Sequence, residues 1–174
     1  MSEVFMTLRP AAIDDAAFVY RVANDPGTRQ ASFRGEPILW GGHLDWYAHR
    51  LADPRYVFLI VCVDSGSANY VRRKPAGYVR FALRDDEAGA EAEITIALAP
   101  EHRGRGLAAR AIMWAMASER LPHSVRRVVA VIKPSNEASL RAFARVGFET
   151  ESMEPGRVVM TLRSNPYLAY IPPT

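Results

Sequence analysis

The spacing of apolar residues divides the chain into a mixed series of strands and helices. Apolar or alternating stretches, bounded by proline, glycine or polar residues, predict strands at 4–9, 56–64, 77–83, 91–99, 127–132, 148–151 and 157–162. Apolar residues at helical spacing predict helices at 14–24, 42–52, 104–120 and 135–146. A polar stretch is expected before residue 42, and turns or loops at 65–74 and 85–89. This order predicts one α/β domain over residues 1–174, with 165–174 as a tail.

The sequence predicts further details for two of the helices. In the helix at 42–52, an apolar stripe of Leu44, Tyr47, Ala48 and Leu51 is expected to face the core. Gly147 follows the last predicted helix, at the position where a helix commonly ends in a left-handed residue.

Composition narrows the class of protein only slightly. Hydrophobic residues make up 49% of the 174 residues and charged residues 24%, which is ordinary for a soluble globular protein. The net charge of +3 suits an anionic small ligand as well as nucleic acid, and the basic cluster at 71–74 is typical of a solvated hairpin tip. The net charge alone therefore decides little, and we predict a small-molecule partner and no nucleic acid.

Several other features limit the location and the partners of the chain. Cys62 is the only cysteine, so we expect a small core residue and neither a disulfide nor a metal site. No apolar stretch approaches the length of a membrane span, and the N-terminus lacks the pattern of a signal peptide, so we expect a cytoplasmic protein without a membrane partner. The tail at 165–174 combines prolines with apolar side chains that could pack on the body or on a second subunit, which leaves a homodimer open.

Glycine and arginine alternate at the start of the third predicted helix, as Arg103, Gly104, Arg105 and Gly106. The unpaired N–H groups of a first helical turn can bind a pyrophosphate, glycines let the main chain approach it, and arginines add positive charge. The Gly-Lys-Ser/Thr of the nucleotide P-loop and the third glycine of the dinucleotide fingerprint are both missing. The pattern therefore predicts a pyrophosphate site of another kind.

This segment resembles the acetyl-CoA motif of the GNAT superfamily of N-acetyltransferases, Arg/Gln-x-x-Gly-x-Gly/Ala, with Arg103, Gly106 and Ala108 at the motif positions. A second block at 136–148 resembles the later motif of the superfamily, with asparagine at the helix start and Gly-Phe after the helix. The resemblance covers residues 77–148. It implies a single-domain α/β fold whose mixed, mostly antiparallel, twisted sheet is splayed open between two central strands and flanked by helices. It also implies acetyl-CoA-dependent N-acetyltransferase activity without a metal.

The resemblance further implies which residues contact acetyl-CoA. Main-chain groups at 96–98 would bind the pantetheine arm and face the thioester carbonyl, and residues 103–108 would hold the pyrophosphate. Asn136 would hydrogen-bond to the arm, with a plain helix N-cap as the alternative. The implied contacts are Ile96, Ala97, Leu98, Arg103, Gly104, Arg105, Gly106, Leu107, Ala108, Asn136, Ser139 and Phe143.

Phe143 departs from the superfamily pattern. Many members carry a tyrosine at this position that acts as general acid for the departing thiolate, and phenylalanine cannot donate a proton. Direct transfer in a ternary complex stays feasible, because a thiol with a pKa near about 8.5 can leave as its thiolate. The general acid is then water, or absent, and Phe143 packs beside the thioester.

Glu93 is the candidate general base, because many relatives place a carboxylate on the strand before this motif. An ordinary surface role for Glu93 is the alternative. An acceptor amine with a pKa near about 8 needs little help with deprotonation, so positioning can supply most of the acceleration.

The amino-terminal third is expected to select a small-molecule amine acceptor. The spacing of residues over 24–47 is similar to that in acetyltransferases that act on nucleotide-linked amino sugars, as in pseudaminic acid biosynthesis, and ribosomal-protein acetyltransferases share parts of it. This similarity implies that Arg29 contacts the acceptor. His43, Trp46 and Arg50 share one helix face, where they could stack on a sugar ring and bind its phosphates. Alternatively, Trp46 is a core residue that the other two border.

Two other functions remain open at this point. One is acetylation of protein N-termini. The other is a regulatory acyl-CoA-binding module without turnover, which the phenylalanine at 143 and the unsettled base both allow.

Overall fold

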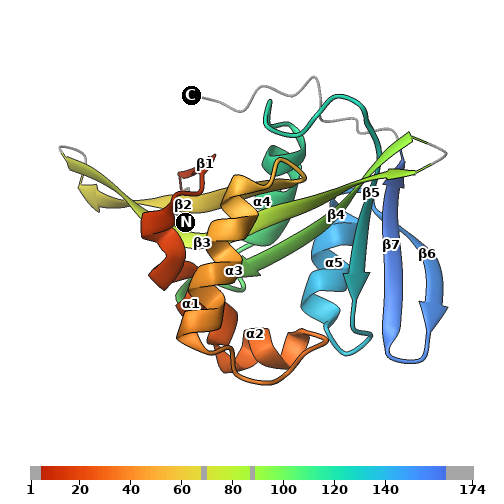
Figure 1. The fold of residues 1–174 in the computed structure, drawn as a ribbon, viewed down its shortest axis with the longest axis horizontal. Helices are drawn as coiled ribbons and strands as arrows, with labels where there is room; N and C mark the ends of the chain where they lie inside the picture. The colour runs from red at the N-terminus through yellow and green to blue at the C-terminus, as the bar shows by residue number, and fades with distance from the viewer. Residues whose placement is uncertain (1–4, 68–69, 87–88, 164–174) are drawn as a thin grey trace.

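A single mixed sheet organises the chain in the computed structural model, which describes residues 5–67, 70–86 and 89–163 (Figure 1). The sheet has the strand order β1-β2-β3-β4-β5-β7-β6. Its strands are β1 (Met6–Pro10), β2 (Tyr56–Ser67), β3 (Tyr70–Asp86), β4 (Gly89–Leu98), β5 (Val125–Ile132), β6 (Glu149–Glu154) and β7 (Arg157–Arg163). The α-helices are α1 (Ala16–Asn24), α2 (Pro26–Ala31), α3 (Trp40–Ala52), α4 (Leu107–Met116) and α5 (Glu137–Arg145). Two short 3₁₀ helices are η1 (Ile13–Asp15) and η2 (Pro100–His102).

The sheet opens between its two central strands. Every neighbouring pair is antiparallel except β4 and β5, which run parallel. These two strands pair only from Ala90 to Glu93 on β4, so in the described sheet residues 94–98 have no partner on the β5 side. The predicted fold class is confirmed: the sheet is mixed, mostly antiparallel and splayed between central strands.

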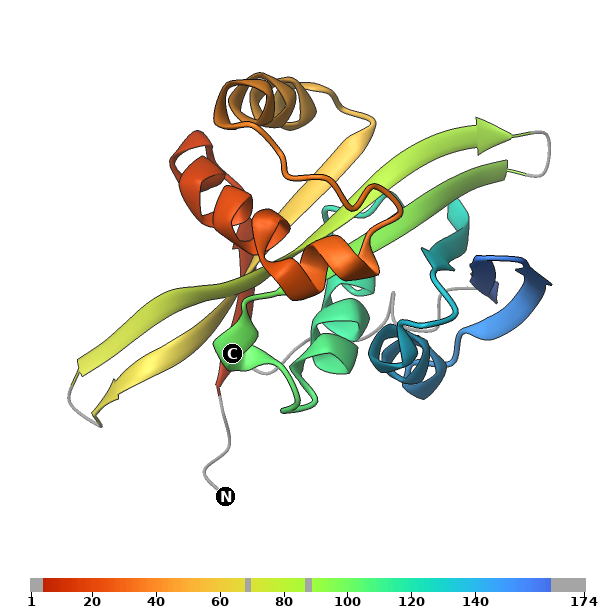
Figure 2. The same ribbon diagram turned by 90° about the horizontal axis from the view of Figure 1, so that it is seen from below.

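Helices cover both faces of the sheet. Figure 2 shows α1, α2 and α3 on one side of the long strands and α4 and α5 on the other. The core on the α4 and α5 side is the larger, with Phe81, Ile112 and Phe148 among its buried members. The opposite core is built around Tyr47 and Phe58.

Cys62 lies in this second core, as predicted. Its side chain is buried, and burial raises the pKa of the thiol. A buried thiol of raised pKa stays protonated and behaves as a small apolar group.

The helix α2 was not predicted from the sequence. Residues 26–31 were expected to belong to a polar stretch, yet they form a short helix because its start carries two good signals. The Asp25 side chain accepts a hydrogen bond from the Thr28 N–H at 3.0 Å, and Pro26 occupies the first turn, where its missing N–H costs nothing.

The buried face of α3 also differs from the predicted stripe. Tyr47 is fully buried as expected, but Leu44 and Ala48 are exposed, and His43 takes the inward position. The His43 ring can be buried because its Nε2 forms a hydrogen bond with the Ala16 carbonyl at 2.9 Å. The predicted stripe was therefore wrong: the buried face of α3 is rotated by about one residue from it.

Two other boundaries are corrected by the structure. The predicted loop at 65–74 belongs to a long hairpin, because the antiparallel pairing of β2 and β3 continues to Ser67 and Tyr70. The helix predicted at 104–120 is confined to α4, because Gly104 and Gly106 before it have positive φ angles of 71° and 73°.

The left-handed end predicted for the last helix is confirmed, since Gly147 follows α5 with a φ of 97°. No helix among the described residues is long and apolar enough to span a bilayer. The tail at 165–174 lies outside the described residues, as does the packing expected of it.

Candidate active site

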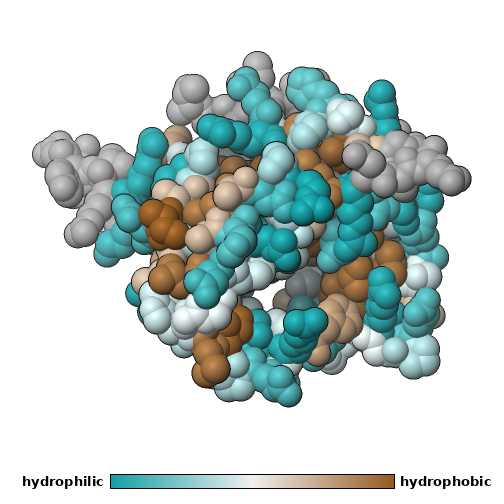
Figure 3. Space-filling view, in the orientation of Figure 1, coloured by the Kyte–Doolittle hydropathy of each residue, from teal (hydrophilic) through white to brown (hydrophobic). Residues whose placement is uncertain are grey.

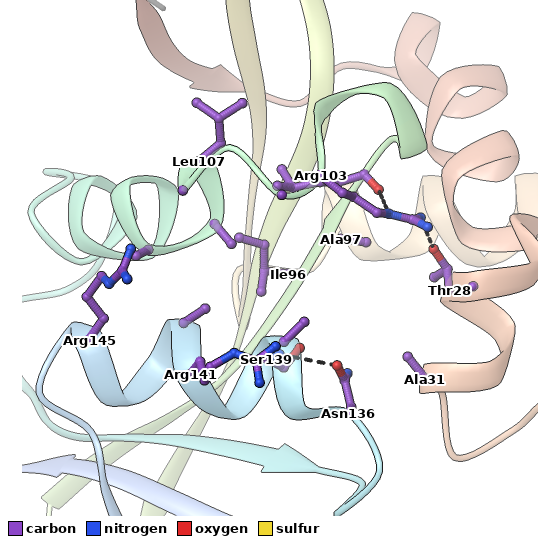
Figure 4. A pocket seen from close by; sticks show the side chains of 18 residues that line it. Thr28, Ala31, Ile96, Ala97, Arg103, Leu107, Asn136, Ser139, Arg141 and Arg145 are labelled. Atoms are coloured by element: carbon purple, nitrogen blue, oxygen red, sulfur yellow. Dashed lines mark hydrogen bonds between the residues drawn. The ribbon is translucent and has the colours of Figure 1, made fainter. Parts of the chain in front are cut away.

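A first cavity of about 490 Å³ lies where β4, α2, the start of α4 and one face of α5 come together. Figure 3 shows the surface hollowed between the amino-terminal helices and α5, and Figure 4 shows the labelled side chains around the cavity. Most of the predicted acetyl-CoA contacts line it: Ile96, Ala97, Leu98, Arg103, Gly104, Gly106, Leu107, Ala108, Asn136 and Ser139. Sequence positions far apart therefore converge on one site.

The start of α4 forms the part of the cavity suited to an anion. Gly106 is the N-cap residue, and no side chain caps the helix, so the N–H groups of the first turn stay open to a ligand. A Cβ placed on Gly104 or Gly106 would meet no atom within 4 Å. Glycine is needed here because of the left-handed φ, and the free space beside it can admit a pyrophosphate.

The Arg103 side chain is held by hydrogen bonds within the protein. Its Nε donates to the Leu98 carbonyl at 2.9 Å, and its Nη2 donates to Asp25 Oδ2 at 2.6 Å and to Thr28 Oγ1 at 3.0 Å. The side chain therefore ties the end of β4 to α2, although it still lines the cavity. Arg105 is exposed and is not among the lining residues.

Two arginines that sequence reasoning missed also line the first cavity. Arg141 and Arg145 lie on α5, on the same helix face as Ala138 and Ala142. These four residues follow i, i+3, i+4 and i+7 spacing, so helical periodicity could have identified them as a face turned to the cavity. Their charge can complement the phosphates of a nucleotide ligand.

The splayed edge of β4 supplies backbone groups on the floor of the cavity. Because β5 leaves β4 after Glu93, residues 94–98 have no strand partner on that side of the described sheet, and the Leu98 carbonyl is engaged by Arg103 Nε instead. Buried backbone groups require hydrogen-bond partners, and an extended ligand lying along the strand could provide them. Asn136 lies across the cavity, where its Oδ1 accepts from the Ser139 N–H at 3.2 Å and caps α5.

A second cavity of about 370 Å³ adjoins the first. The two cavities share six lining residues: Thr28, Ala31, Ile96, Ala97, Asn136 and Ser139. Glu93 and Phe143, the residues that sequence analysis connected with catalysis, both line the second cavity. The site therefore consists of two chambers that meet beside the middle of β4.

Glu93 and Phe143 have well-defined surroundings. Glu93 Oε2 accepts a hydrogen bond from Arg84 Nη2 at 2.8 Å, and the carboxylate remains about one-third exposed, at 32%. Phe143 is buried and packs edge-on against Phe148, with 4.9 Å between ring centroids. Glu91, by contrast, forms an ion pair with Arg127 and is not a lining residue.

The residues expected to contact the acceptor do not line either cavity. His43 is only 1% exposed, and burial lowers the pKa of its ring, which favours a neutral histidine inside the core. Arg29 supports the segment after α2, because it donates to the carbonyls of Ala23 at 2.5 Å and Arg34 at 3.1 Å. Both side chains are thus engaged within the protein.

Trp46 and Arg50 lie on α3, outside the lining of both cavities. The guanidinium carbon of Arg50 sits 4.1 Å from the centre of the Tyr56 ring. The Trp46 ring lies under the guanidinium of Arg80, at 5.5 Å from its carbon, and Arg80 does line the cavity. Trp46 therefore reaches the site through another residue.

Arg80 is a functional candidate that sequence reasoning missed. It is the one charged side chain in the predicted strand at 77–83, and that isolation was the signal. Its Nη2 donates to Thr95 Oγ1 at 3.3 Å, and its Nε is buried without a hydrogen-bond partner among the described residues. Arg157, at the start of β7, lines the same cavity.

Comparison with known proteins places this site in a family. A family model described as acetyltransferase (GNAT) domain matches residues 6–149 of the chain. The sequence matches none of the curated proteins with which it was compared.

Several solved structures share the fold. A spermidine N-acetyltransferase from Vibrio cholerae in complex with CoA and spermine aligns with a TM-score of 0.75 and 20% identity, over 94% of this chain and 98% of that one. The protein yncA from Salmonella typhimurium, with its cofactor acetyl-CoA, gives 0.68 and 21% over 98% of both chains. An aminoglycoside acetyltransferase in complex with coenzyme A gives 0.73 and 17%, over 91% of this chain and 95% of that one.

Proposed function

The chain belongs to the acetyltransferase (GNAT) family, and we propose that it moves an acetyl group from acetyl-CoA to a primary amine of a small molecule. The observation that carries this proposal is the pair of adjoining cavities, one at an uncapped helix start and one around a carboxylate. Two substrates entering from the two cavities would meet beside Ile96 and Ala97. Such an arrangement supports direct transfer in a ternary complex.

Residues of the first cavity fit the donor. The open N–H groups of α4 and the space beside Gly106 suit the pyrophosphate, and the unpaired edge of β4 suits the pantetheine arm. Acetyl-CoA supplies the acetyl group as an activated thioester. The resident groups orient that thioester, and a main-chain N–H of residues 96–98 would donate a hydrogen bond to its carbonyl oxygen.

Residues of the second cavity fit the acceptor. The amine nitrogen forms a bond to the acetyl carbon, the thiolate leaves, and the amine loses one proton. Glu93 is placed to accept that proton, directly or through water, since its carboxylate lines the cavity and stays partly exposed. Phe143 fills the apolar wall beside the reacting centre and leaves protonation of the thiolate to water.

For the acceptor itself we propose a nucleotide-linked amino sugar. The spacing of residues 24–47 supports this class, and so do the two arginines, Arg80 and Arg157, that line the second cavity. The spermidine and aminoglycoside enzymes named above act on small-molecule amines that are not linked to a nucleotide. They support a small-molecule amine as the acceptor, and the nucleotide-linked amino sugar is our more specific proposal. We also propose a cytoplasmic location, where acetyl-CoA is available to such an enzyme.

Release of free thiol from acetyl-CoA tests the proposal. The purified chain is incubated with acetyl-CoA and, in separate reactions, a UDP-linked amino sugar, a peptide with a free N-terminus, or no amine, and the products are identified by mass spectrometry. We expect thiol release with the amino sugar above the amine-free rate, with one acetyl group added per molecule. Turnover of the peptide alone would replace the sugar with protein N-termini. Binding of CoA without turnover of any amine would support a regulatory module.

A further inference from the structure

The lining of the second cavity has more positive than negative side chains. It holds three charged side chains, namely Arg80, Arg157 and Glu93. Glu93 already accepts a 2.8 Å hydrogen bond from Arg84, which lies outside the lining, so its carboxylate has an ion-pair partner other than the two lining arginines. In residues 5–67, 70–86 and 89–163, no carboxylate forms an ion pair with either lining arginine.

Of the two arginines that line the cavity, Arg80 is the more deeply buried. The side chain is buried enough that desolvation lowers its pKa from the ordinary value. The charge of Arg50 acts in the same direction, and Tyr78 and Glu93 oppose the shift without reversing it. Arginine nevertheless stays protonated in proteins. Among the described residues Arg80 forms one long hydrogen bond, to Thr95. Its buried Nε has no hydrogen-bond partner there.

A buried cation without an ion-pair partner is costly, and a ligand anion would relieve that cost. The planar guanidinium donates in a fork that matches a carboxylate or a phosphate. The Trp46 ring behind Arg80 holds the guanidinium in place without neutralising it, because an aromatic face carries no net charge. The arrangement is thus preorganised for an anion on the cavity side.

We propose that the acceptor carries an anionic group, a carboxylate or a phosphate, which binds Arg80 while the amine faces the acetyl donor. This inference rests on the proposed function, since it names the class of amine that the same site takes. The cavity selects against polyamines, because a polycation would bring like charges beside Arg80 and Arg157. Arg80 is then a specificity residue whose partner arrives with the substrate.

Matched pairs of amines test the inference. Glucosamine 1-phosphate and glucosamine differ by a phosphate, and L-alanine and L-alaninamide differ by a carboxylate, so the two pairs separate the two sources of charge. Spermidine provides the polycation. Initial rates of thiol release at saturating acetyl-CoA give kcat/KM for each amine. Calorimetry with the CoA-loaded protein gives the affinity whether or not transfer occurs.

We expect the anionic member of at least one pair to be preferred by about tenfold or more, in rate and in affinity, and spermidine to be the poorest amine. In Arg80→Gln this preference should fall to about twofold or less, with CoA affinity retained as the check on folding. Arg73→Gln is the matched control: Arg73 also lies on β3, its side chain is 62% exposed, and it lines neither cavity. The control should keep the full preference.

Three results would overturn the inference: equal affinity for the neutral and anionic members of both pairs, a preference for spermidine, or an anion preference that survives in Arg80→Gln. The measurement on the unmodified protein does not depend on how the variant folds. An anion preference in binding without acetyl transfer to any amine would leave the inference standing and would overturn the proposed function alone.

Discussion

Arg103 Nη2 donates a 2.6 Å hydrogen bond to Asp25 Oδ2, joining two residues that lie 78 positions apart in the sequence. The bond connects the segment after β4 to the N-cap of α2. The same Asp25 oxygen also accepts from the Thr28 N–H at 3.0 Å, so one carboxylate both caps the helix and holds the arginine. The wall of the first cavity therefore depends on a helix from the amino-terminal third.

Replacement of this carboxylate should weaken the fold in a pH-dependent way. Burial of the Asp25 carboxyl disfavours its charged form, but hydrogen bonds from Arg103 and from the Thr28 N–H outweigh that effect, and the pKa lies below its ordinary value. A carboxyl whose pKa is lower in the folded than in the unfolded state adds stability above the unfolded pKa of about 4, and this contribution is lost as the pH falls. Asp25→Asn should therefore lower the free energy of unfolding at neutral pH, by an amount that shrinks below about pH 4.

Urea unfolding from neutral to acidic pH measures the difference, and calorimetry with CoA should show weaker binding because the cavity wall loosens. Asp53→Asn is the control for binding. Asp53 pairs with Arg55 on the surface and lines neither cavity, so CoA affinity should stay unchanged. A stability loss for Asp25→Asn that does not vary with pH would contradict the role assigned to the Asp25 charge.

The helix start at Gly106 provides a test of pyrophosphate binding. Gly106→Asp places a negative charge beside the open N–H groups of α4, so CoA affinity should fall at least about tenfold, or about 1.4 kcal/mol. The left-handed φ of 73° strains any other residue, but asparagine tolerates it nearly as well as aspartate does. Gly106→Asn therefore separates charge from strain. Calorimetry that gives equal affinities for the two variants would remove the pyrophosphate from this position.

The proton acceptor can be tested on β4. Glu93→Gln keeps the size of the side chain and removes the base, so the rate should fall, by about tenfold, mainly below the pKa of the acceptor amine, where the amine is protonated. Glu91→Gln is the matched control, because Glu91 lies two residues earlier, pairs with Arg127 and lines neither cavity. A pH-rate profile for Glu93→Gln that coincides with the unmodified one would show that the cavity works by positioning alone.

Patterns that depend on neighbouring residues were enough to predict most of the fold. Strand alternation and helical spacing predicted the seven strands and four of the helices, and the motif before α4 predicted the first cavity. The helix α2 was missed because Asp25, Pro26 and Gly27 were assigned to the polar stretch before residue 42. In the structure the first two of these residues start a helix, which Arg103 stabilises from elsewhere in the chain.

The acceptor side was harder to predict, because side-chain environment there is decided by tertiary packing. A shared helix face for His43, Trp46 and Arg50 was correctly inferred from spacing, but spacing does not tell which layer that face packs against. The hydrogen bond from the His43 ring to Ala16, on another helix, decides that His43 is buried. The sequence does show that Arg80 is the one charged residue of an apolar strand, but that its side chain is largely buried beside a cavity becomes visible only when the strands around it are assembled.

Trp46 offers the last prediction, since it lies under Arg80 and not on the cavity surface. A cation–π contact is worth roughly 1 kcal/mol, so Trp46→Leu should release the Arg80 guanidinium and raise KM for an anionic acceptor about fivefold. KM for acetyl-CoA should hold, because neither Trp46 nor Arg80 lines the first cavity. His43→Gln is the control on the same helix: glutamine can still donate to the Ala16 carbonyl. The His43 ring packs against Trp46, with 5.7 Å between ring centroids, but among the described residues it has no ring or hydrogen-bond contact with Arg80 itself. That variant should lower the melting temperature and leave both KM values unchanged. If His43→Gln and Trp46→Leu raise the acceptor KM equally, the effect comes from loosening of α3 as a whole, and the specific support of Arg80 by Trp46 is excluded.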